Sequence, residues 1–205
     1  FVVGLLGNIV SIMLFFSPMP IFYRIVKQKS TEGFSCMPYT VALFSAMLWL
    51  FYGLINTTVP LVLTINAFGC AVETVYIVIF IVYANRKERI LALKMVFADA
   101  LGLGSIVIVT MAAVKSKKHR VKVVGWISMV FATLVFVAPL SVMRKVIQTR
   151  SAEFLPITLS VALLLVAIIW FVYGFLLHDV YIMAPNILGF MFAIAQIILY
   201  VKYRK

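Results

Sequence analysis

The sequence predicts an all-α membrane protein with seven transmembrane helices, arranged as two parallel three-helix bundles joined by a linker helix (3+1+3). Three observations lead to this prediction: an apolar composition, seven long apolar runs and an internal duplication. Of the 205 residues, 65% are hydrophobic and 12% are charged, and the mean hydropathy is +1.15. Because a soluble domain of 23.0 kDa cannot hide so much apolar surface, we expect the chain to lie in a lipid bilayer.

Each predicted helix is an apolar run long enough to cross a hydrocarbon core of roughly 30 Å. The runs are Phe1–Tyr23, Tyr39–Ile55, Val59–Ala84, Met95–Val114, Val123–Met143, Ile157–Leu177 and Val180–Val201. The first run has no basic leading region and is followed by further spans, so it is not expected to be a secretory signal. A chain that begins at Phe1 rather than at Met is expected to have been trimmed.

The chain repeats itself at an offset of about 121 residues. The matching segments are Phe16–Phe34 with Val137–Phe154, Trp49-x-x-Tyr52-Gly53 with Trp170-x-x-Tyr173-Gly174, and Asn66-x-x-Gly69 with Asn186-x-x-Gly189. The run Met95–Val114 matches neither half. Three membrane crossings end on the side opposite to their start, so a second copy joined directly to the first would be inverted. We expect this run to add one crossing and so make the two copies parallel. The predicted parts are the first triple-helix repeat (1–84), the linker helix with its flanking loops (85–120) and the second triple-helix repeat (121–205).

The basic residues predict the orientation in the membrane. With the amino terminus outside, thirteen of the 18 lie on the inner side: Arg24, Lys27, Lys29, Arg86, Lys87, Arg89, Lys94, Arg144, Lys145, Arg150, Lys202, Arg204 and Lys205. This excess predicts an outer amino terminus and a cytoplasmic carboxyl terminus. The five others, Lys115, Lys117, Lys118, Arg120 and Lys122, form an outer cluster that the rule does not explain. Because the charges never form one surface, no nucleic-acid partner is expected.

A series of motifs along the chain resembles the SWEET family of sugar transporters. The motifs are KSTEGF with a downstream MPY, ALFSAMLW, TINAFG, APLSVMR, RSAEFLP, WFVYG and APNILG. ALFSAMLW and TINAFGCAVETVYI are most similar to the plant members associated with sucrose. The resemblance covers nearly the whole chain and implies two halves related by an axis along the membrane normal. It also implies a passive, bidirectional uniporter of glucose, sucrose or both in the plasma membrane, working by alternating access with the sugar between the bundles.

Two asparagines are candidate sugar ligands. Asn66 and Asn186 lie about seven residues inside their helices, roughly 10 Å at 1.5 Å per residue, and so near the middle of the bilayer. An unpaired amide at that depth costs on the order of 1 to 3 kcal/mol, and sugar hydroxyls are suitable partners. A hydrogen bond to a neighbouring helix is the alternative. Their equivalent positions in a duplicated chain favour sugar binding.

Trp49 and Trp170 form a second matched pair near mid-membrane. A lone indole there more often fills a core, but a pair of indoles can sandwich a pyranose ring, as the resemblance implies. By the same resemblance, four further residues complete the wall of the site: Ser11, Ser45, Val135 and Val166. Val166 stands where some relatives have serine.

Four prolines are predicted to form a hinge at the inner mouth. Pro18 and Pro139 lie near the ends of the first and fifth helices, and Pro38 and Pro156 open the second and sixth on the same side. Each interrupts backbone hydrogen bonding. Ordinary capping is the alternative, but the duplication and the resemblance to the family's proline tetrad favour a hinge. The prolines without a repeat partner, which are Pro20, Pro60 and Pro185, are expected at local kinks.

At the outer mouth, Tyr52 and Asp179 are predicted to close a gate through a charge-assisted hydrogen bond, as the resemblance implies. The alternative is an interfacial tyrosine and a solvated aspartate.

Glu73 and Asp99 are intramembrane carboxyls that the repeat does not duplicate. We expect Glu73 to remain protonated and to bond a neighbouring helix, and a proton-coupled carrier is kept as an alternative. There is no phosphate loop or metal-ligand spacing, so no enzyme, metal or cofactor is expected, and Cys36 and Cys70 are expected to be apolar filler. A seven-helix receptor is a further alternative, but it would show no duplication. Association between protomers is left open.

Overall fold

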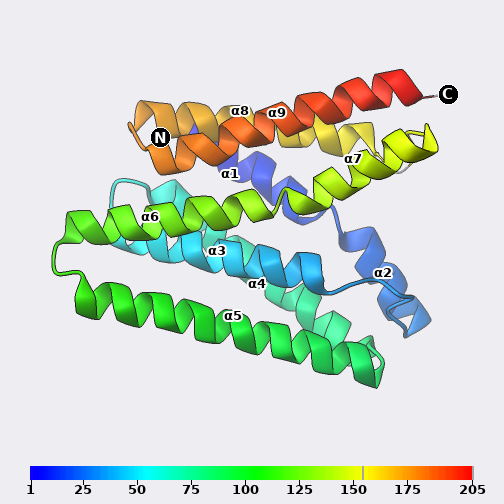
Figure 1. Cartoon of the computed structure of the whole chain (residues 1–205), viewed down its shortest axis with the longest axis horizontal. Helices are drawn as coiled ribbons and strands as arrows, with labels where there is room; N and C mark the ends of the chain where they lie inside the picture. The colour runs from blue at the N-terminus through cyan, green and yellow to red at the C-terminus, as the bar shows by residue number, and fades with distance from the viewer. Residues whose placement is uncertain (154, 205) are drawn as a thin grey trace. The chain divides into compact units, whose positions relative to one another are not determined.

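The computed structural model describes residues 1–153 and 155–204, without the side chains of residues 137 and 138. Phe154 and Lys205, both in the predicted second repeat, lie outside the described residues. Within the described part the regular elements are nine α-helices (Figure 1): α1 (Val2–Phe15), α2 (Met19–Gln28), α3 (Met37–Ile55), α4 (Pro60–Tyr83), α5 (Arg86–Ala113), α6 (Lys117–Leu134), α7 (Val137–Thr149), α8 (Ile157–Leu176) and α9 (Val180–Tyr203).

These helices form seven stretches that are long and apolar enough to cross a membrane. The first stretch, Val2–Gln28, consists of α1 and α2, and the fifth, Lys117–Thr149, consists of α6 and α7. Each of the other five is a single helix. The prediction of an all-α protein with seven membrane-length helices is therefore confirmed, and two of the seven spans are broken.

Two spans begin earlier than their apolar runs do. α5 begins at Arg86 rather than at Met95, because Asn85 caps it: the Asn85 side chain accepts a hydrogen bond from the backbone N–H of Glu88 at 2.9 Å. α6 begins at Lys117 rather than at Val123. Arginine, lysine and glutamate are good helix formers although they are not apolar, so a criterion of hydropathy misses these first turns.

The prolines without a repeat partner agree with the prediction of local kinks only in part. Pro60 is the first residue of α4 and Pro20 the second of α2, where the missing N–H would have no intrahelical partner. The expectation of a kink is wrong for Pro60, whereas Pro20 lies next to the break in the first span. Pro185 lies inside α9.

The chain packs as two compact units. Unit 1 is Phe1–Leu14 with Met129–Lys205, and unit 2 is Phe15–Ser128. The two points at which the chain passes from one unit to the other lie within the broken spans. α1 belongs to unit 1 up to Leu14, and α2 belongs to unit 2. α6 is divided between the units after Ser128. The predicted repeats follow sequence similarity, whereas the units follow packing.

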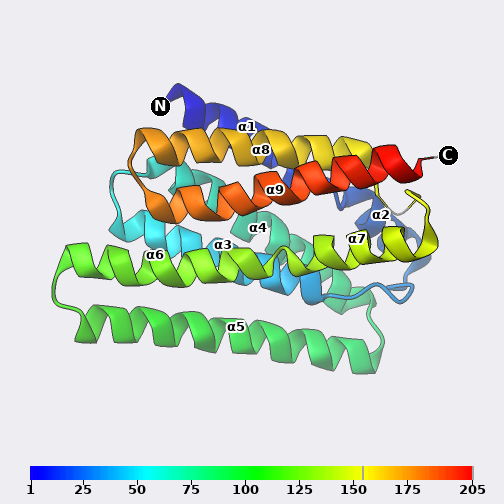
Figure 2. The same ribbon diagram turned by 45° about the horizontal axis from the view of Figure 1, so that its top comes forward.

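Within unit 1, α8 and α9 lie side by side and antiparallel, joined by a short turn (Figures 1 and 2). Asp179 caps α9 in this turn. Ser160 of α8 donates a hydrogen bond to Oε1 of Gln196 in α9 at 2.9 Å, with both side chains buried.

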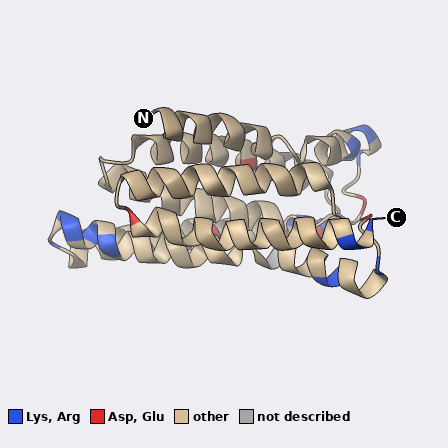
Figure 3. Ribbon diagram, turned by 90° about the horizontal axis from the view of Figure 1, so that it is seen from above, with Lys and Arg blue, Asp and Glu red and all other residues tan. Residues whose placement is uncertain are grey.

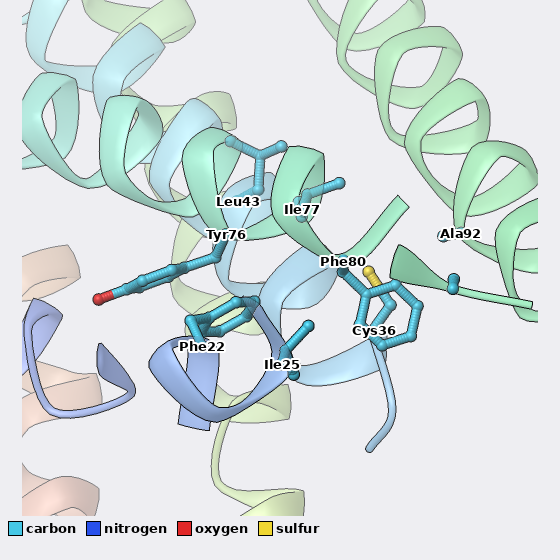
Figure 4. Packing of buried hydrophobic residues seen from close by; sticks show 9 residues of the cluster. Phe22, Ile25, Cys36, Leu43, Tyr76, Ile77, Phe80 and Ala92 are labelled. Carbon is cyan, nitrogen blue, oxygen red and sulfur yellow. The ribbon is translucent and has the colours of Figure 1, made fainter. Parts of the chain in front are cut away.

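Unit 2 has a core of buried side chains from α2, α3, α4, α5 and the residues that cap α3 and α4 (Figure 4): Phe22, Ile25, Cys36, Leu43, Tyr76, Ile77, Phe80, Ala84 and Ala92. Phe22 stacks on Tyr76 with ring centroids 4.3 Å apart. The Tyr76 hydroxyl donates to the carbonyl of Phe15 at 2.9 Å. That carbonyl would accept from Met19 in an unbroken helix, but Met19 bonds to Phe16 instead. Tyr76 therefore stabilises the break in the first span.

Lysine and arginine gather toward the ends of the helices (Figure 3). Arg120, one of the five residues in the unexplained basic cluster, bonds the carbonyls of Val114 at 2.6 Å and Met111 at 2.9 Å. It thus satisfies orphan carbonyls at the end of α5. This gives one member of the cluster a structural role.

Candidate substrate site

In unit 1, α1 and α8 bring two predicted site residues together. The Trp170 indole Nε1 donates to Ser11 Oγ at 3.0 Å, and each side chain is only 8% exposed. One turn before Ser11, Gly7 lets the helix approach the ring: a Cβ at Gly7 would lie 3.1 Å from Trp170 Cε2. The face of α1 formed by Gly7 and Ser11 therefore holds the indole.

The two asparagines make the same local contact in both units. Asn66 Nδ2 donates to the carbonyl of Val62 at 2.8 Å, and Asn186 Nδ2 donates to the carbonyl of Ile182 at 2.7 Å. Each bond runs to the amide's own helix, four residues back, and both side chains are half-buried. No bond from either amide to a neighbouring helix is found in the part of the chain that the structure describes. The amide oxygen and the second N–H are left for another partner.

The two tryptophans also share a local geometry. Trp49 packs edge to face on Tyr52 with centroids 5.4 Å apart at 83°, and Trp170 packs on Tyr173 at 5.4 Å and 85°. Such pairs fix ring orientation. Trp49 is half-buried, whereas Trp170 is buried.

The predicted wall residues lie close to these rings along the chain. Ser45 is buried one turn before Trp49 on α3, and Val166 is half-buried one turn before Trp170 on α8. Val135 is 40% exposed and lies in the break between α6 and α7.

The four predicted hinge prolines occupy helix breaks or helix starts. Pro18 precedes α2 at the break in the first span, and Pro139 is the third residue of α7, directly after the break in the fifth. Pro38 is the second residue of α3, and Pro156 immediately precedes α8. Pro18 thus lies in the interruption of the first span, and Pro139 lies in the first turn after the interruption of the fifth.

The predicted gate residues belong to different units, and each has a local role. Tyr52 is 1% exposed, and its hydroxyl accepts from Asn56 Nδ2 at 3.1 Å. Asp179 is 8% exposed, and its Oδ1 accepts from the backbone N–H groups of Tyr181 and Ile182 at 3.1 and 3.2 Å. The alternative of a solvated aspartate is therefore wrong, since Asp179 is a buried helix cap.

Glu73 is 6% exposed in α4, and no hydrogen bond of its carboxyl is found among the described residues. Among the residues that the structure describes, the expected bond to a neighbouring helix is therefore not found. Cys36, just before α3, is buried, and this burial raises the pKa of its thiol to about 11. An unreactive thiol of this kind agrees with a packing role. Within the described ranges, no group of three or more His, Cys, Asp or Glu could hold a metal ion.

Sequence reasoning missed Gly7 and Tyr76. A signal for Gly7 was present, because Gly4, Gly7 and Ser11 are small residues three and four positions apart on one helix face. Tyr76 gave no signal, since its partner is a backbone carbonyl 61 residues away.

Comparisons with known proteins identify the family of this chain. The sequence profile of the family described as "Sugar efflux transporter for intercellular exchange" matches residues 1–88 and 122–205. The chain is 47% identical over 203 residues to "Bidirectional sugar transporter SWEET13" of Oryza sativa subsp. japonica, covering 99% of this chain and 69% of that protein. It is 49% identical over 205 residues to "Bidirectional sugar transporter SWEET10" of Arabidopsis thaliana, covering 100% and 71%.

A third relative, "Bidirectional sugar transporter SWEET15" of Oryza sativa subsp. indica, is 46% identical over 204 residues, and the chain spans 64% of its length. The fold matches a solved structure described as "The 3.7 A resolution structure of a eukaryotic SWEET transporter", with a TM-score of 0.94 and 36% identity. That match covers 99% of this chain and 95% of the other. The chain therefore belongs to the SWEET family of sugar efflux transporters, integral membrane proteins that are not enzymes.

Proposed function

We propose that this chain is a passive, bidirectional carrier of glucose, sucrose or both that works by alternating access. The observation that carries the proposal is the repeated pair of asparagines. Asn66 and Asn186 each bond their own helix and keep an amide oxygen and an N–H for a ligand, at equivalent positions of two repeats. The names of the relatives, bidirectional sugar transporters, point to the same substrate class.

Sugar recognition follows from the chemistry of the paired residues. The Asn66 and Asn186 amides hydrogen-bond hydroxyls at the edge of a pyranose, while Trp49 and Trp170 cover its apolar faces. Ser11, Ser45, Val135 and Val166 line the remaining wall. Because the two repeats contribute equivalent residues, the sugar is bound between them.

Movement of the inner mouth is assigned to the four prolines, and closure of the outer mouth to Tyr52 and Asp179. Pro18 and Pro139 lie at breaks in their spans, where backbone hydrogen bonding is already interrupted. These are the places where the helices bend most easily. The buried state of Tyr52 and Asp179 is consistent with a gate that excludes water.

The arrangement in the membrane follows from the repeat and from the basic residues. Residues 1–84 and 121–205 form the two triple-helix repeats and 85–120 the linker, a division supported by the two segments that the family profile matches. The excess of inner-side lysine and arginine supports an outer amino terminus and a cytoplasmic carboxyl terminus. The plasma membrane is the proposed location.

Uptake of radiolabelled glucose and sucrose into liposomes, with and without a pH gradient, tests the proposal. The Asn66→Ala and Asn186→Ala variants are expected to lose roughly tenfold or more of uptake, because each removes hydrogen bonds to the sugar. A matched control is Thr74→Val: Thr74 also back-bonds its own helix in α4, to the carbonyl of Cys70 at 2.6 Å, but it is exposed. Near-normal uptake by both alanine variants would show that the amides are structural.

A proton-coupled carrier is the second candidate. The observation that favours it is Glu73, a buried carboxyl within a span for which no hydrogen bond is found among the described residues. Intramembrane carboxyls often carry protons in transporters. In the liposome experiment, acceleration of uptake by an inward proton gradient would favour this candidate over passive transport.

A further inference from the structure

The Trp170 indole is fixed at two points by α1. Its N–H is engaged by Ser11 Oγ at 3.0 Å, and its ring edge lies against the backbone of Gly7, where a Cβ would come within 3.1 Å. Both side chains of the hydrogen bond are more than nine-tenths buried, so water does not compete for it. The indole N–H offers one donor, and that donor is already used.

The duplication does not preserve this arrangement. At the offset of 121 residues that relates Pro18 to Pro139, Gly7 corresponds to Ser128 and Ser11 to Ala132. Alanine has no acceptor, so the contact that engages the Trp170 N–H has no counterpart in the other repeat. The nearest serine on the equivalent helix is Ser128, one helical turn before Ala132. Ser128 is fully buried, and its Oγ has no hydrogen-bond partner in the described ranges.

Trp49, the counterpart of Trp170, differs in the same respect. The two rings pack identically on Tyr52 and Tyr173. However, Trp49 is only half-buried, and no hydrogen bond of its indole N–H is found among the described residues. The two rings therefore pack alike, whereas only the N–H of Trp170 has a hydrogen-bond partner among the described residues.

We propose that Ser11 is a positioning residue that holds Trp170 as a fixed platform, while Trp49 donates its N–H to a sugar hydroxyl. This rests on the proposed function and deepens it, since it names which of the two paired indoles hydrogen-bonds the substrate. An asymmetric site suits a sugar, because the two faces and edges of a hexose or disaccharide are not equivalent. The repeats then supply equal ring surface but unequal polar contacts.

Substitution of single tryptophans by 3-benzothienylalanine tests the assignment, because that residue keeps the ring shape and lacks the N–H. Equilibrium binding of tritiated glucose and sucrose to the purified full chain gives the Kd. Trp49→benzothienylalanine should raise the Kd about fivefold, the effect of losing one hydrogen bond. Trp170→benzothienylalanine and Ser11→Ala delete the same internal bond, so their effects should be equal, and the double variant should be no weaker than either single one.

The positioning role of Ser11 has a readout that needs no sugar. In a background with Phe at positions 49 and 126, Trp170 is the only tryptophan. Ser11→Ala should then lower the fluorescence anisotropy of Trp170, and Ser11→Thr should restore it because the hydroxyl is kept. Unchanged anisotropy in Ser11→Ala would overturn the positioning role.

Two binding results would overturn the assignment of the donors. One is an unchanged Kd for Trp49→benzothienylalanine, and the other is a further loss of binding when Trp170→benzothienylalanine is added to Ser11→Ala. Absence of sugar binding by the parent chain would instead refute the proposed function and the sugar contact of Trp49 with it. The anisotropy measurement would still decide the role of Ser11.

Discussion

Asn66 and Asn186 show how a single side chain can be both anchored and available. The bond from Nδ2 to the carbonyl four residues back, at 2.8 and 2.7 Å, fixes the rotamer before any ligand arrives. Less side-chain entropy is then lost on binding. The same contact also fixes the orientation of the amide oxygen. In the proposed sugar site, both amides would therefore be preorganised for their ligand.

Tyr76 provides a test of stability at the level of one hydroxyl. Tyr76→Phe keeps the stack on Phe22 but leaves the Phe15 carbonyl without its donor, so the free energy of unfolding should fall by roughly 1 to 3 kcal/mol. Thermal unfolding in detergent measures this. The control is Tyr23→Phe, in which the lost hydroxyl belongs to an exposed side chain and no change is expected. Equal unfolding midpoints for parent and Tyr76→Phe would mean that water already satisfies that carbonyl.

Substitution of Glu73 provides a test between passive and coupled transport. If its role is structural, Glu73→Gln keeps the volume and the hydrogen-bonding capacity, and uptake should stay nearly unchanged from about pH 5.5 to about 7.5. Uptake into liposomes over this range, with Asp99→Asn as the companion variant, gives the answer. A sugar-driven proton current that Glu73→Gln abolishes would make the protein a symporter.

At the scale of helices, apolar runs predicted all seven spans because crossing lipid demands about 20 apolar residues. They did not predict where α5 and α6 begin, since the charged first turns of these helices depend on capping and helix propensity. The duplication singled out the asparagines, tryptophans and prolines. It could not predict the Ser11 to Trp170 bond, because that contact joins the two repeats across 159 residues and only one copy of the sequence encodes it.

The helix breaks lead to a prediction about the transport cycle. Alanine at Pro18, Pro38, Pro139 or Pro156 restores a backbone donor, so the helix can continue and the inner ends should stiffen. Each variant should be at least as stable to heat, still bind sugar from one side and exchange it slowly. Tracer exchange across liposomes, measured beside equilibrium binding, separates these properties.

Pro60→Ala is the matched control for the prolines. Pro60 is the first residue of α4 and lies on the outer side in the predicted topology, so its replacement should not stiffen the inner mouth and exchange should remain at the parent rate. Should all four tetrad variants also exchange at that rate, these prolines are caps and breaks without a role in movement.

On the scale of the whole molecule, packing and ancestry divide the chain differently. Similarity assigns α1 to the first repeat, yet residues 1–14 pack in unit 1 with residues 129–205. The contacts of Gly7 and Ser11 with Trp170 are part of this packing. Unit 1 is therefore discontinuous in sequence, whereas unit 2 is one uninterrupted segment.

Removal of residues 1–14 should consequently damage the far end of the sequence. Trp170 loses its hydrogen-bond partner and its glycine contact, so α8 should lose protection against hydrogen exchange. The core of unit 2 around Phe22 and Tyr76 should keep its protection. Ile9→Ala is the control, because Ile9 is 51% exposed and its truncation should leave α8 unchanged. A uniform loss of protection in both units would show that they do not unfold separately.

The discontinuity of unit 1 also sets the order in which its parts can assemble during synthesis. Ser11 of α1 leaves the ribosome 159 residues before its partner Trp170, a delay of roughly 8 to 30 seconds at the usual rates of translation. During that interval α1 must wait in the membrane without its native neighbour. Its sequence, VVGLLGNIVSIMLF, carries no charge, so lipid alone can host it. Unit 2 can be completed in the meantime, and α8 and α9 then pack with α1 to complete unit 1.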